Sequence, residues 1–334
     1  MRLNTNYLGL QLENPLVPAA SPLSMDLDTV KKLEDAGAPA LVMYSLFEEQ
    51  ILHERDQMEH FLEFGTDSFA ESLSFFPEPE DYATGPEEYL EHLRKIKEMV
   101  AIPVIGSLNG ITASGWTDYA QKMVEAGADA LELNIHYLPV DFTETGTAVE
   151  QRYVDIVKAV KDQVSVPVAV KIGSRFSSLP AFTRSLEEAG ADGLVLFNRF
   201  YHPDINLEKL EMEPAMRATT SADIRMAMRW IAILRAHLKL SFAASSGVHQ
   251  AQDVLKLVMC GADVTMLATA LMRHGPGYIA TLKQDLVEWM DENEYQNLEQ
   301  MKGSMSMTHM PTPQALVRAN YTKTLQDFRQ ETWK

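Results

Sequence analysis

A lysine closes one of the most apolar segments of the chain, where a charged side chain needs a reason to be. Lys171 follows Val168-Ala169-Val170, a run that predicts a buried strand. Its ammonium group could face an anionic ligand, or it could form a structural ion pair with a carboxylate of the protein. As a neutral amine it could instead attack a carbonyl and form a Schiff base. The pattern favours the anionic ligand and leaves the other two interpretations open.

Polar side chains close two neighbouring apolar runs as well. Asn134 and Asn198 are amides that suit hydrogen bonding to a planar heterocycle with alternating donors and acceptors. His136 and Tyr137 follow Asn134 and could move protons. Histidine titrates near neutrality, whereas tyrosine would need its pKa lowered by roughly three units or would act as a neutral donor. The remaining histidines show no paired spacing, and we predict no metal site.

Small residues follow three further apolar runs. Ala19-Ala20-Ser21 would let a flat ligand lie close to the backbone. Ser246-Gly247-Val248 and Ala268-Thr269 would expose backbone N–H groups beside a helix N-terminus, and such groups bind anions. We therefore predict a phosphate site at these last two segments, although small-residue segments also form tight turns.

One repeated pattern indicates how these residues come together. A helix end, a glycine, a tight turn and an apolar run follow one another around Gly37, Gly127, Gly190 and Gly261. A helix that repeatedly leads into a buried strand predicts a parallel β/α protein. In a barrel of this kind, the residues that do chemistry follow the carboxyl ends of the strands.

Eight apolar runs of strand length can be counted, and amphipathic helical patterns lie between most of them. We predict a (β/α)8 TIM barrel, with an open doubly wound sheet as the alternative. The strands are predicted at Pro15–Ala20, Ala40–Ser45, Pro103–Leu108, Ala130–His136, Pro167–Ile172, Gly193–Asn198, Ser241–Ser246 and Asp263–Thr269. The helices are predicted at Asp26–Ala36, Gly85–Val100, Gly115–Ala126, Val149–Val164, Leu179–Ala189, Ser221–Leu238 and Gln250–Cys260.

Two connections and the C-terminal part interrupt this regular order. The connections at 46–84 and 199–220 are long enough to be lids or pocket walls. We predict the barrel over residues 1–284 and a C-terminal helical extension over 285–334 that is not an independent domain. The methionine-rich stretch 301–307 is interpreted as a mobile linker beside a peripheral helix, in preference to a cap on the barrel or a subunit contact.

Composition limits the classes of protein. The 334 residues include 29 Lys and Arg against 47 Asp and Glu, a formal net charge of −18, which argues against binding to nucleic acid or anionic lipid. The single cysteine, Cys260, excludes an internal disulfide and a cysteine-ligated iron–sulfur cluster. No targeting pattern opens the chain and no run approaches the ~20 apolar residues of a membrane span, so we expect a cytoplasmic protein.

In their order and spacing, these segments resemble the dihydroorotate dehydrogenase family of FMN-dependent barrels. The resemblance runs from about Leu8 to His274. It rests on Asn14 to Ser21, on Glu132-Leu133-Asn134 and on Val168-Ala169-Val170-Lys171. It continues through Ser245-Ser246-Gly247-Val248 with Asp253, Cys260-Gly261-Ala262-Asp263 and Ala268-Thr269-Ala270-Leu271.

The resemblance implies an FMN cofactor and an oxidation or reduction at a CH–CH bond. Lys171 would lie near the N1/O2 edge of the flavin, a base would remove one proton, and a hydride would pass to flavin N5. The residues implied in FMN binding are Ala19, Ala20, Ser21, Tyr44, Ser45, Asn109, Asn134, Lys171, Ser246, Gly247, Val248, Ala268 and Thr269.

The chain departs from the family pattern on the substrate side. The position of the catalytic base falls on Tyr137, with His136 beside it, and the position of a substrate-binding asparagine falls on Pro139. A lysine expected after the second strand is replaced at about Tyr44. The substrate segment of the long loop reads Glu71-Ser72, and Glu71 would repel a carboxylated substrate.

The substrate is therefore predicted to be a dihydropyrimidine or another cyclic amide, bound by Glu71, Ser72, Asn134 and Asn198. Two alternatives remain, a flavin-binding subunit of a larger redox complex and a cofactor-free Schiff-base lyase that uses Lys171. Electrons would come from a soluble substrate, a nicotinamide or a partner subunit. We also expect a homodimer.

Overall fold

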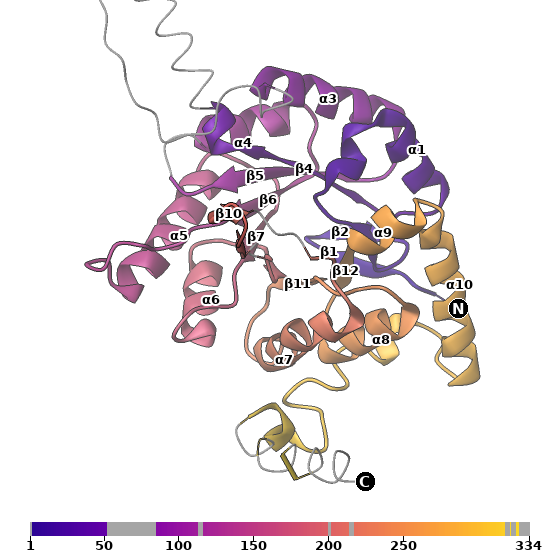
Figure 1. Ribbon diagram of the computed structural model, residues 1–334. Coiled ribbons are helices and arrows are strands. Elements are labelled where there is room, and N and C mark those ends of the chain that lie inside the picture. The colour runs from indigo at the N-terminus through magenta and orange to yellow at the C-terminus, as the bar shows by residue number, and fades with distance from the viewer. Residues whose placement is uncertain are drawn as a thin grey trace, which may run out of the picture.

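Eight parallel strands follow one another around a nearly closed barrel, with helices between them on the outside (Figure 1). The computed structural model describes residues 2–51, 85–112, 116–199, 202–213 and 217–317, together with 321, 325 and 326. Its main sheet has the strand order β3-β12-β11-β8-β7-β6-β5-β4, and its two end strands, β3 and β4, lie side by side. The prediction of a TIM barrel is confirmed.

The eight strands and the first seven helices named below begin and end within a few residues of their predicted bounds, and two further helices follow the last strand. The strands are β3 (Leu16–Pro18), β4 (Leu41–Phe47), β5 (Val104–Gly110), β6 (Ala130–Ile135), β7 (Val168–Ile172), β8 (Gly193–Leu196), β11 (Ser241–Ser245) and β12 (Val264–Leu267). The helices are α1 (Leu27–Asp35), α3 (Pro86–Met99), α4 (Trp116–Glu125), α5 (Gly146–Lys161), α6 (Leu179–Glu188), α7 (Ile224–Leu234), α8 (Ala251–Cys260), α9 (Thr269–His274) and α10 (Tyr278–Glu292).

Three of the glycine repeats place an aspartate just before a strand, and each aspartate performs the same task. Its carboxylate accepts a hydrogen bond from a backbone N–H at the start of the preceding strand and pairs with a cation at the end of the helix that leads into that strand. Asp129 binds Val104 N and Lys97 at 2.7 Å each, Asp192 binds Val168 N at 2.8 Å and Lys161 at 2.7 Å, and Asp263 binds Phe242 N at 2.7 Å and Arg235 at 3.0 Å.

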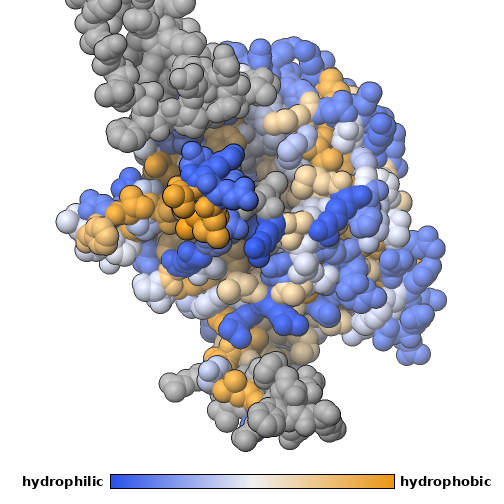
Figure 2. All heavy atoms as spheres, in the orientation of Figure 1, coloured by the Kyte–Doolittle hydropathy of each residue, from blue (hydrophilic) through white to orange (hydrophobic). Residues whose placement is uncertain are grey.

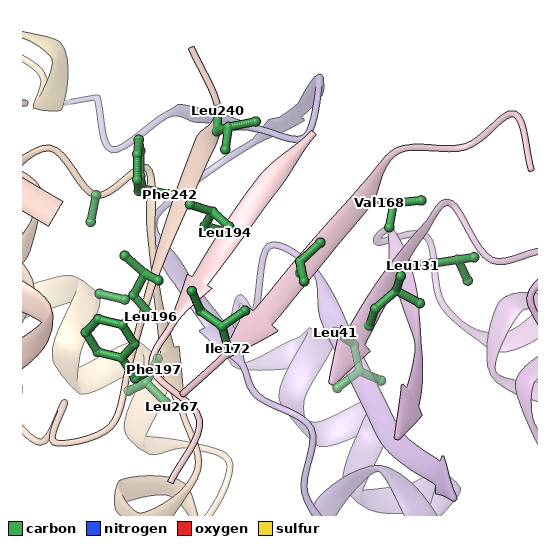
Figure 3. Packing of buried hydrophobic residues seen from close by; sticks show 14 of the residues in the cluster. Leu41, Leu131, Val168, Ile172, Leu194, Leu196, Phe197, Leu240, Phe242 and Leu267 are labelled. Carbon is green, nitrogen blue, oxygen red and sulfur yellow. The ribbon is translucent and has the colours of Figure 1, made fainter. Parts of the chain in front are cut away.

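Alternate strand residues divide into an inner and an outer apolar cluster. On β8, Leu194 and Leu196 belong to the outer cluster beneath the helices, whereas Val195 belongs to the inner cluster. Figure 3 shows such outer residues on neighbouring strands, among them Leu131 and Val168. The period of two, which is the geometry of an extended strand, therefore assigns each side chain to one face of the barrel wall.

A short N-terminal hairpin, which the sequence patterns did not predict, joins the inner cluster. Its strands β1 (Thr5–Tyr7) and β2 (Leu10–Leu12) pair antiparallel. The buried side chains of Tyr7, Leu8 and Leu12 pack with inward-facing residues of the barrel strands. Since the hydroxyl of Thr5 binds the carbonyl oxygen of Asp263, which precedes β12, the hairpin is attached at the end where the strands begin.

The long connection after β8 contains a second hairpin, formed by β9 (Asp204–Asn206) and β10 (Glu211–Glu213). The apolar residues of this hairpin are exposed, and they form an apolar area in the space-filling view (Figure 2). They are Ile205, Leu207, Leu210 and Met212. The other long connection lies almost wholly outside the described residues.

The structure corrects two details at the C-terminal side. Thr269, predicted to end the last strand, begins α9. The stretch predicted to be a mobile linker is bound to the barrel, because the backbone N–H groups of Gly303 and Met305 donate to carbonyl oxygens at the end of α8. Helix α10 continues through residue 284, and the division into barrel and extension remains a prediction.

Two further observations concern the described residues only. None of their helices is long and apolar enough to cross a membrane. Cys260, at the end of α8, is buried, and burial raises the pKa of its thiol to about 11.

The aspartate ties can be tested at Asp263, whose carboxylate also lies 3.0 Å from Nζ of Lys302. Asp263→Ala would leave Arg235 and a buried N–H without this acceptor, and Lys302 with its exposed partner Glu299 alone. We expect the free energy of unfolding to fall by about 3 kcal/mol, as measured by denaturant titration. Asp162→Ala is the control, because this exposed residue has no such tie; an equal loss in both variants would contradict the role given to Asp263.

Candidate active site

The predicted site residues within the described part of the chain gather at the carboxyl ends of the strands. The register shows which of them are neighbours: Asn109 of β5 lies beside Asn134 of β6, and Asn134 lies beside Lys171 of β7. Ala130, which precedes Asn134 on β6, and Ala169, which precedes Lys171 on β7, belong to the inner cluster and lie an even number of positions away. Strand alternation therefore turns these polar side chains toward the barrel axis.

Lys171 has a carboxylate partner inside the barrel. Its Nζ lies 3.3 Å from Oε1 of Glu132, and the two side chains are 9% and 1% exposed. The structural ion pair left open by the sequence is therefore present. An ammonium has three N–H donors, and this is its one hydrogen bond within the described residues, so it keeps donors for a ligand. Sequence reasoning did not name Glu132 as a site residue, although an acid inside an apolar strand was a usable signal.

Two amides meet at the mouth of the barrel. Nδ2 of Asn198 donates to Oδ1 of Asn134 at 2.6 Å, and the backbone N–H of Asn198 donates to the carbonyl oxygen of Ile172. The contact uses the acceptor of one amide and a donor of the other. What remains is the Asn134 NH2 donor beside the Asn198 carbonyl acceptor. A donor next to an acceptor is complementary to the edge of a cyclic amide.

Two residues after β11 have the left-handed backbone that favours glycine, and the second of them is a glycine. Ser246 and Gly247 have φ of 76° and 87°, and a Cβ on Gly247 would lie 2.7 Å from the backbone nitrogen of Ile224. The carboxylate of Asp253 anchors the end of this segment, because it accepts hydrogen bonds from the backbone N–H groups of His249 and Gln250. Close packing against the start of α7 thus fixes the segment.

This segment and the start of α9 supply free N–H groups. In the described structure, the amides of Gly247 and Val248 donate no hydrogen bond to the chain. The first turn of α9, from Thr269, leaves N–H groups without partners in the helix. The two segments follow the neighbouring strands β11 and β12. Free N–H groups of this kind bind anions, and the phosphate site at these two segments stays a prediction.

The predicted cofactor residues on the other side of the mouth are largely buried. Ala19 binds β12 through its backbone N–H, and Ser21 has a buried hydroxyl without a hydrogen-bond partner in the described structure. Ser45 Oγ lies 2.9 Å from Ser107 Oγ, which places Ser45 on the inner side after an irregularity in β4. The backbone N–H of Tyr44 donates to Oγ of Ser24, and its ring packs edge-on against Tyr89.

Tyr137 is turned away from the other site residues. Its ring packs against the outer cluster and lies under the guanidinium of Arg152 on α5, 4.5 Å from the ring centroid. Its hydroxyl donates to Oε2 of Glu144 at 2.5 Å. That hydrogen bond raises the pKa of Tyr137, which is the opposite of the lowering that a tyrosine base needs.

His136 remains as a candidate for proton transfer. It stands two residues after the inward-facing Asn134, so strand alternation favours the inner side for its ring. It is half-buried, and burial lowers its pKa from the usual 6.5. At neutral pH the imidazole is therefore in the form that accepts a proton.

Two predicted substrate residues, Glu71 and Ser72, lie outside the described residues. Among the described residues, no group of three or more His, Cys, Asp or Glu side chains is arranged to hold a metal ion.

Comparisons with known proteins agree with this architecture. A family model described as dihydroorotate dehydrogenase matches residues 82–290. The dihydroorotate dehydrogenase B (NAD(+)) catalytic subunit of Thermoplasma volcanium is 26% identical over 305 residues, which cover 90% of this chain and 97% of that protein. The same subunit of Pyrococcus abyssi is 26% identical, with 90% and 98% covered. The NAD-dependent dihydropyrimidine dehydrogenase subunit PreA of Escherichia coli K12 is 23% identical over 331 residues, with 92% and 78% covered.

The need for glycine after β11 can be measured against a second glycine. Gly9 has a φ of 79° and no atom within 4 Å of the place that a Cβ would take, whereas Gly247 has a similar φ and backbone atoms within 3 Å of that place. Gly9→Ala should cost about 1 kcal/mol of unfolding free energy from the positive φ alone. Gly247→Ala should cost about 2 kcal/mol more, because the start of α7 must also move. Equal losses in thermal or denaturant unfolding would contradict the close packing.

Proposed function

Because this chain belongs to the dihydroorotate dehydrogenase family of flavin-dependent oxidoreductases, we propose that it uses FMN to oxidise or reduce a CH–CH bond in a dihydropyrimidine-like cyclic amide. The observation that carries the proposal is the amide pair Asn134–Asn198, which lies beside Lys171 at the barrel mouth. A neutral dihydropyrimidine offers an N–H next to a C=O along its ring edge. That edge complements the free donor and acceptor of the pair.

The residues at the mouth fit an FMN molecule. The free amides of Gly247 and Val248, with the first turn of α9, would hold its phosphate. Lys171 would face the edge of the ring that gains negative charge on reduction, and the small side chains of Ala19 and Ala20 leave room for a flat ring. The buried Ser21 hydroxyl is a further unpartnered group for it. When bound, FMN supplies a hydride acceptor at N5.

We assign the proton transfer to His136 and not to Tyr137. Oxidation of a CH–CH bond removes a hydride and a proton, and the proton needs an acceptor at the mouth. The pKa of His136 is lowered by burial, which keeps it neutral, whereas Tyr137 is engaged with Glu144 and Arg152. Tyr137 would then hold the segment between β6 and α5 in place.

The Schiff-base alternative loses support from the contact between Lys171 and Glu132. An ammonium that is hydrogen bonded to a carboxylate has no lone pair with which to attack a carbonyl.

We further propose that electrons leave or enter through a partner subunit. Two observations support this. The relatives are described as subunits, and the one cysteine of this chain is too few to ligate an iron–sulfur cluster. A dimer of this chain and a cytoplasmic location remain predictions.

The cofactor and the substrate class can be tested together. The purified protein, after incubation with FMN, should show a flavin absorption spectrum, and anaerobic addition of 5,6-dihydrouracil should bleach it. Dihydroorotate is the comparison compound, since it differs from 5,6-dihydrouracil by one carboxylate. Bleaching by dihydroorotate alone would overturn the substrate class, and a protein that takes up no FMN would overturn the proposed function.

The proton acceptor can be tested by variants and by pH. His136→Asn should slow flavin reduction about 100-fold, whereas Tyr137→Phe should change it little. Because the pKa of His136 is lowered, the reduction rate should rise with pH, with a midpoint below 6.5. Stopped-flow absorbance measures both. The reverse pattern, with a slow Tyr137→Phe variant, would move the role to Tyr137.

If electrons pass through a partner subunit, two oxidants should reoxidise the reduced flavin of this chain at different rates. For the purified chain with reduced FMN, a small one-electron dye should reoxidise the flavin quickly, whereas NAD+ should do so at least tenfold more slowly. Rapid reoxidation by NAD+ alone would show that this chain needs no partner subunit.

A further inference from the structure

Glu132 is a buried acid whose position the proposed chemistry does not yet explain. Its side chain is 1% exposed, Oε1 accepts the hydrogen bond from Lys171, and Oε2 has no hydrogen-bond partner among the described residues. Burying a carboxylate is costly even when it is paired. A residue with only a structural task here could be apolar, as Ala169 beside it on β7 is.

The strand register places Glu132 behind Lys171 when both are viewed from the mouth. Glu132 is level with Ala169, two residues before Lys171 on β7, which is about 7 Å deeper along the strand direction. A ligand at the mouth therefore meets the ammonium first and the carboxylate behind it. The pair presents a dipole to the ligand, and its field is weaker than that of a lone lysine.

Among the described residues, Lys171 is the one cation that forms an ion pair with Glu132. Tyr7, from the N-terminal hairpin, is fully buried and has a hydroxyl without a hydrogen-bond partner in the described structure. Burial first, and then the negative charges of Glu132 and Asp263, raise its pKa well above the usual value. Tyr7 is therefore neutral, and Lys171 remains the cation that the structure places against Glu132.

We propose that Glu132 is a positioning residue that fixes the Lys171 ammonium between itself and the flavin and weakens its field, so that the bound FMN is harder to reduce than it would be beside an unpaired lysine. This inference rests on the proposed function, since it needs the flavin at the mouth. Reduction adds negative charge to the ring, and a nearby carboxylate opposes that charge in a site of low dielectric constant. The two charges of the pair therefore act in opposite directions on the same equilibrium.

The test is the reduction potential of bound FMN, measured by anaerobic reduction against a reference dye. Glu132→Gln should favour the reduced flavin at least tenfold, which for a two-electron couple is a rise of about 30 mV. It should also tighten the binding of sulfite to the flavin at least tenfold, because the sulfite adduct carries the same ring charge. Asp162→Asn is the control, since it removes one negative charge from an exposed residue at the end of α5, away from the barrel mouth.

A second pair of variants gives the same answer if Glu132→Gln folds poorly. Lys171→Met should lower the potential, and the double variant Glu132→Gln/Lys171→Met should raise it again by at least the same 30 mV. Equal potentials in Glu132→Gln and the wild type, or in the single and double methionine variants, would overturn the inference while FMN remains bound. Failure of the wild type to bind FMN is a different result, which would overturn the proposed function and the inference with it.

Discussion

The tie between an aspartate at the start of one strand and the backbone of the strand before it sets the register of the barrel wall. Asp129, Asp192 and Asp263 each make this tie. A shift of one residue would turn every side chain of a strand to the opposite face. Lys171 and Asn134 would then point into the outer apolar layer, so the chemistry at the mouth depends on carboxylates at the other end of the strands.

The barrel interior is divided along its axis by what fills it. Apolar side chains and the N-terminal hairpin pack the end where the strands begin, and amides, hydroxyls and the ion pair occupy the end where they finish. Side chains fill the interior of an eight-stranded barrel. Each polar group at the carboxyl ends of the strands therefore needs a hydrogen-bond partner, either a neighbouring side chain or a ligand. The hydrogen bond from Asn198 to Asn134 and that from Lys171 to Glu132 meet part of that need, and the donors left over define what a ligand has to offer.

The eight strands and most helices were predictable because the local sequence patterns favour the same elements that the fold contains. Each strand is an apolar run next to a glycine, a proline or a small polar residue, and burial on both faces makes the run continuous. The hairpin Thr5–Leu12 was missed because strands of three residues carry too few positions to show a period. The binding of Gly303 and Met305 to α8 was missed because it uses backbone groups, which leave no trace in the side-chain sequence.

The sequence predicted which strand ends carry the site residues, but it did not predict the direction in which each side chain points. Lys171, Asn134 and Asn198 were found because a polar residue that closes an apolar run is conspicuous. Tyr137 was paired with His136 as an equal candidate, because alternation weakens beyond a strand end and the Glu144–Arg152 cluster that captures its hydroxyl involves a helix further along the chain. Glu132 was interpreted as part of a sequence motif, and its pairing with Lys171 depends on the register between β6 and β7.

The buried thiol at the end of α8 has a practical consequence for spectroscopy. Cys260 combines burial with a pKa of about 11, so at neutral pH it is almost entirely the unreactive thiol. A cysteine introduced at an exposed position such as Phe142 or Leu207 would then react alone with a maleimide dye or a spin label. Distances from the barrel mouth to any partner could be measured on the natural background, without first replacing a residue of the core.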